Sequence, residues 1–103
     1  MKTGIEIITE ARQHQIDVEG FYSSHDDTHT EGELANAAAC YALTDEMREH
    51  FNDDFGQDQW LRLWPFELQW LKLTPDDRIK ELGKAGGLIA AEIDRLNREK
   101  ELI

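Results

Sequence analysis

The side chains best suited to chemistry gather in one polar segment, residues 25–33. It holds two imidazoles and four carboxylates within nine residues. Neutral imidazole nitrogens and carboxylate oxygens together bind zinc, manganese or iron, whereas carboxylates alone suit magnesium. The segment therefore supplies a set of candidate metal ligands, with Mg²⁺ or Zn²⁺ as the expected cofactor: His25, Asp26, Asp27, His29 and Glu33.

The same segment also suits a purely structural role. Asp26 or Asp27 can cap the chain where it enters a turn, and the histidines can satisfy loop carbonyls. Glu33 stands three residues after Thr30, which is the spacing of a capping box. Because capping is a common use of such residues, we favour the structural network and keep the metal site open beside it.

A second set of candidate ligand-binding residues lies downstream: Trp64, Trp70, Lys84 and Glu92. Tryptophan rings can stack on a planar ligand, the ammonium of Lys84 can meet an anion, and Glu92 adds a carboxylate beside an apolar helix face. The simpler interpretation is that the rings of segment 60–73 seal a small core. Glu92 and Arg95 have the i,i+3 spacing of a surface ion pair, but Glu92 lies closer to the apolar stripe than Asp94, for which we favour such a surface pair with Arg98.

Several familiar motifs are excluded by their spacing. Counting back five residues from Gly56 puts Phe51, not an acidic ligand, at the first position of a calcium loop. The glycines within 83–87 fall inside an expected helix with no strand before it, so they form no phosphate-binding loop. Cys40 stands among alanines in the most apolar helix, which indicates a buried, inert thiol rather than a nucleophile.

The segments that must position these side chains read mostly as helices. Thr3 and Glu6 have capping-box spacing and start a first helix that runs toward Gly20. The stretch 21–28 lacks a helical period and reads as a loop. Small and apolar residues then fill 34–43, which predicts a central helix buried on most sides.

Shorter elements follow the central helix. Thr44 caps a short helix through His50, and residues 52–58 read as a turn. Pro65 interrupts the aromatic segment 60–73, which we expect to form an irregular hydrophobic cover. The fold class is therefore all-α: a compact helical domain of three main helices plus a short helical or irregular aromatic segment, in a single domain over residues 1–103.

The last helix carries the clearest pattern. Thr74 caps it and Pro75 occupies its first turn. Apolar or small residues recur at alternating steps of three and four, which predicts one buried face: Ile79, Leu82, Gly86, Ile89, Ile93 and Leu96. Each glycine of this helix costs ~1 kcal/mol of helix propensity. We therefore expect a close approach of another backbone, with Ala37 to Ala39 as the natural partner.

The charge balance limits the partners. Eleven Lys and Arg against 22 Asp and Glu give a net charge of −11, which argues against nonspecific nucleic-acid binding. An acidic chain can still bind a nucleotide through a divalent cation, or a basic protein patch directly. One cysteine allows no intrachain disulfide, and no stretch approaches the ~18 apolar residues of a membrane span. We expect a cytoplasmic protein with no membrane partner, either a monomer or a homo-oligomer.

Blocks along nearly the whole chain resemble a family of small proteins encoded by phages and prophages. The blocks that carry the likeness are His25-Asp26-Asp27, Gly32-Glu33-Leu34-Ala35, residues 37–42, Trp64-Pro65, Trp70-Leu71-Lys72, residues 84–89 and residues 91–96. The resemblance implies a phage-type protein that acts in the cytoplasm of a host cell. It brings no secure activity with it.

A weaker likeness is to the all-α nucleoside triphosphate pyrophosphohydrolases, whose helices present Glu-x-x-Glu and Glu-x-x-Asp pairs to magnesium. Here Glu33 is followed three residues later by Asn36, and Glu92 is followed by Arg95. The four-carboxylate cage is therefore incomplete, and the chain looks more like a binding protein than an enzyme.

Three functional hypotheses follow. The first is a phage-type accessory protein that holds a small nucleotide-like ligand, with or without a divalent metal, and so sequesters a host signal. The second is an acidic interaction module that inhibits a basic host protein, which the charge of −11 favours. The third is a nucleotide pyrophosphohydrolase.

Overall fold

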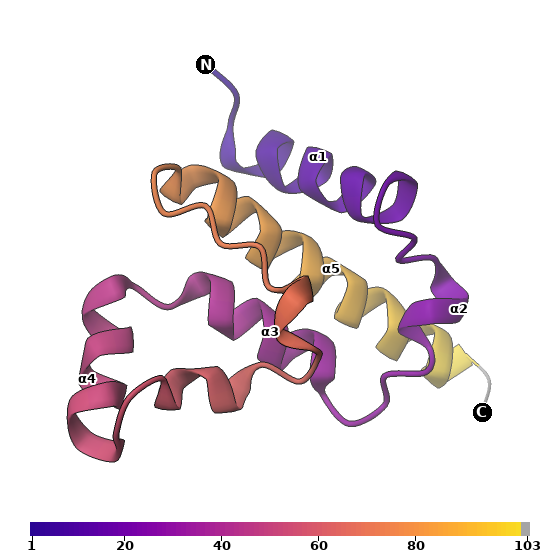
Figure 1. The fold of residues 1–103 in the computed structure, drawn as a ribbon. Helices are drawn as coiled ribbons and strands as arrows, with labels where there is room; N and C mark the ends of the chain where they lie inside the picture. The colour runs from indigo at the N-terminus through magenta and orange to yellow at the C-terminus, as the bar shows by residue number, and fades with distance from the viewer. Residues whose placement is uncertain (102–103) are drawn as a thin grey trace.

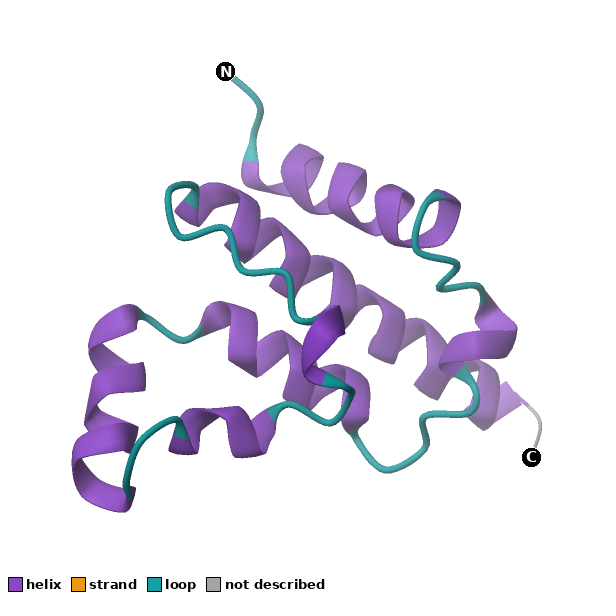
Figure 2. Ribbon diagram, viewed as in Figure 1, coloured by secondary structure: helices purple, strands orange, loops and turns teal. Residues whose placement is uncertain are grey.

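The computed structural model describes residues 1–101, without the side chain of Phe55. All regular elements in this part of the chain are helical, so the fold is all-α (Figures 1 and 2). Five α-helices and two short 3-10 helices follow one another: α1 (Gly4–Asp17), α2 (Ser23–Asp26), α3 (Glu33–Ala42), α4 (Asp45–Phe55), η1 (Gln59–Leu63), η2 (Leu68–Trp70) and α5 (Arg78–Glu101). None of the helices in this range combines the length and apolar character needed to cross a membrane.

Helix α5 is the central element, with α1 packed along one side and α3 along another (Figure 1). Leu34, Ala37 and Ala38 of α3 are almost completely buried, as is Leu88 of α5. Trp60 and Trp64 close the same core from the aromatic segment. Small side chains on both helices allow the close packing, because little volume separates the two backbones.

The expected helix starts are confirmed at two positions. Thr3 and Glu6 form the reciprocal bonds of a capping box at the start of α1. The side chain of Thr44 accepts a hydrogen bond from the Met47 backbone at 3.1 Å, which caps α4. These bonds satisfy backbone donors that have no partner within the helix.

Other boundaries differ from expectation. The stretch 21–28 contains the short helix α2, and α4 continues through part of the expected turn at 52–58. Helix α3 begins after Gly32, whose φ of 83° is in the left-handed region, so Thr30 does not cap it. At the start of α5 the Asp77 carboxylate accepts a hydrogen bond from the Lys80 backbone N–H at 3.1 Å. The cap is therefore Asp77, three residues after the predicted Thr74.

The prediction of which face of α5 is buried within this chain is wrong. Its large members, Ile79, Leu82, Ile89, Ile93 and Leu96, are all exposed to solvent. The buried residues of the helix lie on another face: Glu81, Gly83, Ala85, Gly87, Leu88, Ala91, Glu92 and Arg95. Together with Leu88, glycines, alanines and paired polar residues therefore make most of the intrachain contact, and the small ones let α1 and α3 approach closely.

The glycines of α5 serve a close approach, but to α1 rather than to the Ala37 to Ala39 segment. A Cβ on Gly83 would lie 2.9 Å from Ile7 Cγ2, and one on Gly86 would lie 2.5 Å from Ile8 Cγ1. On Gly87 it would lie 2.9 Å from the amide of Gln15. Helix α1 therefore occupies the space that side chains would take.

This contact predicts that Gly86→Ala lowers the free energy of unfolding by about 1 kcal/mol, since overpacking of ~1–3 kcal/mol outweighs the gain in helix propensity of ~1 kcal/mol. Gly4→Ala is the control, because nothing lies within 4 Å of its added Cβ. It should leave stability unchanged or raise it. Urea unfolding followed by circular dichroism measures both, and equal stabilities for the two variants would contradict the close approach.

Candidate functional site

A groove of about 1170 Å³ opens between α1 and residues 66–74, with α5 at its base. Aromatic rings form much of its lining: Phe21, Tyr41, Trp64, Phe66 and Trp70. Ligand sites in proteins are typically concave and mostly apolar, with a few convergent polar groups. The groove has this composition, and it is large enough for a nucleotide-sized molecule.

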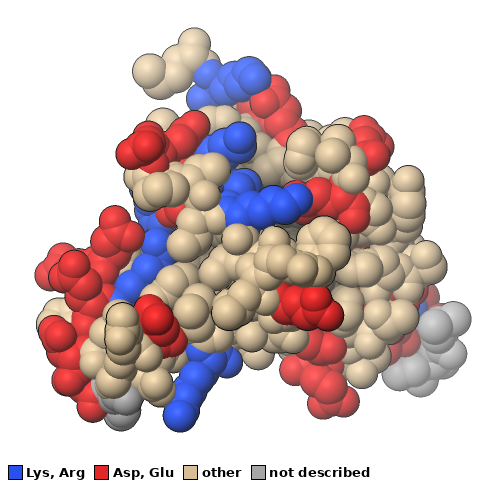
Figure 3. Space-filling view, in the orientation of Figure 1, with Lys and Arg blue, Asp and Glu red and all other residues tan. Residues whose placement is uncertain are grey.

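Basic side chains concentrate at the groove. Four of the five lysines of the chain line it, against three carboxylates: Lys2, Lys72, Lys80 and Lys84, with Glu10, Glu19 and Asp77. Basic side chains cross the middle of the face drawn in Figure 3, with acidic ones around them. In a chain of net charge −11 this is an unusual local surplus of positive charge.

Two of the lysines stand close together without full compensation. Burial lowers the pKa of Lys84, and the charges of Lys80 and Lys72 lower it further. The Lys84 ammonium donates to the Lys72 carbonyl at 2.5 Å and lies 5.5 Å from the centre of the Tyr41 ring. Within residues 1–101 the side chain of Lys80 makes no hydrogen bond or ion pair. An anion placed between these ammonium groups would relieve their repulsion.

The two tryptophans predicted as ligand-binding residues differ in role. Trp64 is buried and edge-on to Tyr41, and its indole N–H donates to the Glu67 carbonyl at 3.0 Å. Trp64 therefore belongs both to the hydrophobic core and to the wall of the groove. Trp70 is 56% exposed, with the ammonium of Lys72 5.8 Å from its ring centre. Its ring is therefore available for stacking, whereas the core interpretation fits Trp64.

Gln15 adds a buried polar group to the groove. It is 4% exposed, and its Nε2 donates to the Lys84 carbonyl at 3.2 Å. Its Oε1 is buried and has no hydrogen-bond partner. A buried amide oxygen without a partner costs roughly 1–3 kcal/mol, so a donor on a bound molecule would be favourable there.

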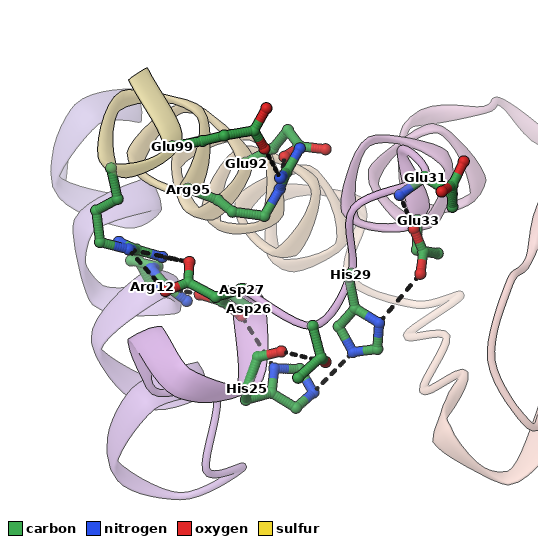
Figure 4. Close-up of polar contacts among 12 residues, drawn as sticks. Arg12, His25, Asp26, Asp27, His29, Glu31, Glu33, Glu92, Arg95 and Glu99 are labelled. Atoms are coloured by element: carbon green, nitrogen blue, oxygen red, sulfur yellow. Dashed lines mark hydrogen bonds and ion pairs between the residues drawn. The ribbon is translucent and has the colours of Figure 1, made fainter. Parts of the chain in front are cut away.

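The polar segment forms a chain of contacts at one end of the groove (Figure 4). Asp26 is completely buried and accepts from Arg12 at 2.8 Å, and its other oxygen lies 3.0 Å from His25 Nδ1. The Nε2 atoms of His25 and His29 are 3.4 Å apart. His29 Nδ1 then lies 3.3 Å from Glu33. These contacts form a continuous line of polar groups from the buried carboxylate of Asp26 to the half-buried carboxylate of Glu33.

Rings and backbone groups hold the two ends of this line. Phe21 stacks on His25 with ring centres 4.4 Å apart, and Phe66 lies edge-on to His29 at 5.0 Å. The pKa of Glu33 is lowered: partial desolvation opposes the shift, and backbone donors of residues 31–33 together with His29 outweigh it. The shortest of these bonds runs from the Glu31 N–H at 2.6 Å.

The five candidate metal ligands do not meet at one point. His25 and His29 face the groove, whereas Asp26 is held by Arg12 and Asp27 by Arg98 at 2.8 Å. Within residues 1–101 no group of three or more His, Cys, Asp or Glu side chains is arranged to hold a metal ion. The polar segment is held by ion pairs and side-chain contacts rather than by the expected caps and loop-carbonyl bonds. The metal site stays a prediction.

Glu92, the remaining candidate, lies outside the groove. It forms a buried ion pair with Arg95 at 2.5 Å, and Arg95 also bonds Glu99 (Figure 4). The i,i+3 pair with Arg95 is therefore present, and it is buried rather than at the surface. Arg98 bonds Asp27 at 2.8 Å, so the polar segment is tied to the last turns of α5.

Sequence reasoning missed Lys80, Lys72 and Phe21 of the groove. Lys80 stands four residues before the predicted Lys84 on a helix, a like-charge spacing that was visible in the sequence. Lys72 and Phe21 gave no such signal, because the loops that carry them reach the groove only through tertiary packing. Cys40 is buried as expected, and burial raises its pKa to about 11, so the thiol stays protonated at neutral pH.

Carboxylates surround the face drawn in Figure 3, and those of α4 line one edge of it. Asp45, Glu46 and Glu49 are all exposed there. No protein-family model, curated protein or solved structure matches the chain. The likeness to phage proteins and the basic protein partner therefore stay predictions.

The buried end of the polar line leads to a stability test. Asp26→Asn should lower the free energy of unfolding by about 3 kcal/mol, because it leaves the Arg12 guanidinium buried without its counter-ion. The control is Asp27→Asn, whose exposed pair with Arg98 should change stability by less than about 1 kcal/mol. Guanidinium unfolding compares the variants. A loss for Asp26→Asn no greater than the control's would show that the pair does not anchor the segment.

Proposed function

We propose that the groove binds a small anionic ligand that carries a planar ring, of the nucleotide class. The observation that supports this most directly is the gathering of four of five lysines around an aromatic groove in a strongly acidic chain. A phosphate group suits the lysines, and a ring suits the exposed face of Trp70. Both requirements point to one kind of ligand.

The groups of the groove divide the work of binding. Lys80 and Lys84 take the anion, because they repel each other and the Lys80 side chain has no hydrogen bond or ion pair within residues 1–101. The free Oε1 of Gln15 accepts from a ring N–H or amino group. The ring itself stacks on an aromatic wall such as Trp70.

A divalent cation enters this proposal with the ligand rather than with the protein. Mg²⁺ binds phosphates readily and keeps several of its waters, so it needs few protein ligands. Binding without turnover then gives a protein that sequesters a small nucleotide, as expected of a phage-type accessory protein that withholds a host signal. The proposed activity is binding without turnover. Pyrophosphate release from nucleoside triphosphates would instead indicate an enzyme.

Isothermal titration of the whole chain with linear and cyclic nucleotides, each with and without Mg²⁺, tests the proposal. Lys80→Met should weaken the best ligand about tenfold, because one charge-assisted contact is lost. The matched control is Lys100→Met, which removes an exposed lysine outside the groove and should leave affinity unchanged. Absence of heat from every nucleotide, or equal effects of the two variants, would contradict a nucleotide groove.

The affinity should also depend on pH in a defined direction. The pKa of Lys84 is lowered by burial and by its lysine neighbours. An anion binds the protonated form, so affinity should be greatest at neutral pH and fall as pH rises through this lowered pKa. Titrations from neutral to alkaline pH measure the fall. Lys84→Met should flatten the profile, and an affinity that rises with pH would argue against anion binding at Lys84.

A further inference from the structure

The exposed apolar side chains of α5 lie on one line along the helix. Their exposed fractions run from 46% for Leu82 to 63% for Ile79. With Gly86 they recur at steps of three, four, three, four and three residues, which is the seam of a coiled coil. The seam extends for ~26 Å along the helix, and a monomer rarely leaves so long an apolar stripe in water. We call these residues the α5 seam: Ile79, Leu82, Gly86, Ile89, Ile93 and Leu96.

Helix α1 widens the surface beside the seam. Ile8 packs where a side chain of Gly86 would stand, and Ile5, one turn earlier, is 79% exposed. Apart from Ile79, no member of the seam lines the lysine groove. The seam and the groove are therefore largely separate surfaces of the molecule.

We propose that the α5 seam is the contact surface between two copies of this chain, packed antiparallel. The spacing of the seam residues along the helix is the same from either end. An antiparallel second helix therefore places an apolar residue opposite each seam position. Twofold dimers require such self-complementary surfaces. Ile79 then meets Leu96 of the second copy, and Leu82 meets Ile93 of the second copy.

The charges at the two ends of the seam favour the antiparallel register. Lys100 continues the seam by one step beyond Leu96, and Asp76 lies in the turn just before α5. Both are exposed, and neither has an ion-pair partner within residues 1–101. The antiparallel register brings Lys100 beside Asp76 of the second copy, at both ends of the dimer. A parallel register would bring like charges together, which is unfavourable.

Sedimentation equilibrium of the whole chain tests the dimer. The unmodified chain should show a concentration-dependent dimer, and Ile93→Asp should raise its dissociation constant at least ~30-fold by placing a charge in the seam. Leu68→Asp is the control, since Leu68 is similarly exposed but lies on η2. It should dimerise like the parent. Circular dichroism confirms that both variants keep their helices.

A charge exchange tests the direction of packing. Lys100→Asp alone should weaken the dimer about tenfold at low salt, and Asp76→Lys alone should act similarly. The double variant should recover the parental dissociation constant, because each pair is restored with its signs exchanged. Failure of the double variant to recover would overturn the antiparallel register.

Three results would overturn the proposal as a whole. If the chain stays monomeric at its highest soluble concentration, or if the monomer adsorbs tightly to lipid vesicles, the seam serves a different partner. If Ile93→Asp dimerises like the parent, the contact lies elsewhere. None of these results bears on nucleotide binding, since the seam variants lie outside the groove and can be titrated with ligand separately.

Discussion

The structure depends on how closely α1 and α3 approach α5. Glycines face α1 and alanines face α3, so both neighbours pack against nearly bare backbone. Two helices fixed at this short distance leave a gap between them on the same side of α5, and the segment 66–74 turns that gap into the groove. Large side chains on this face would push the helices apart and remove the walls that define the site.

The ion pair of Arg12 and Asp26 fixes the second feature of the site. A fully buried carboxylate is unfavourable unless it is paired and hydrogen-bonded, and Asp26 has both a guanidinium and an imidazole as partners. Because α1 supplies the guanidinium, the polar segment is tied to the same helix that forms one wall of the groove. His25 and His29 are thereby held at the rim, with rings on either side of them.

Charge is distributed to match this architecture. Carboxylates dominate the exterior and α4 in particular, whereas the lysines converge on the groove, where burial and mutual repulsion make them receptive to an anion. The apolar seam lies on a different face of α5 from the groove lysines Lys80 and Lys84. One helix thus offers two surfaces with different physical character, and ligand binding and self-association need not compete for them.

The sequence alone determined the helical class, two of the caps and the burial of Cys40, because these follow from local propensity, capping chemistry and apolar composition. It also located His25, His29, Trp70 and Lys84, all of which line the groove.

Only the tertiary structure decided which face of α5 is covered. Periodicity marks an apolar stripe but does not say whether this chain or another molecule covers it, and here the glycine and alanine face took the intrachain contact. The partners of Asp26 and Asp27 could not be predicted from the sequence either. Arg12 and Arg98 reach them from helices 14 and 71 residues away, and such contacts exist only once the helices have packed.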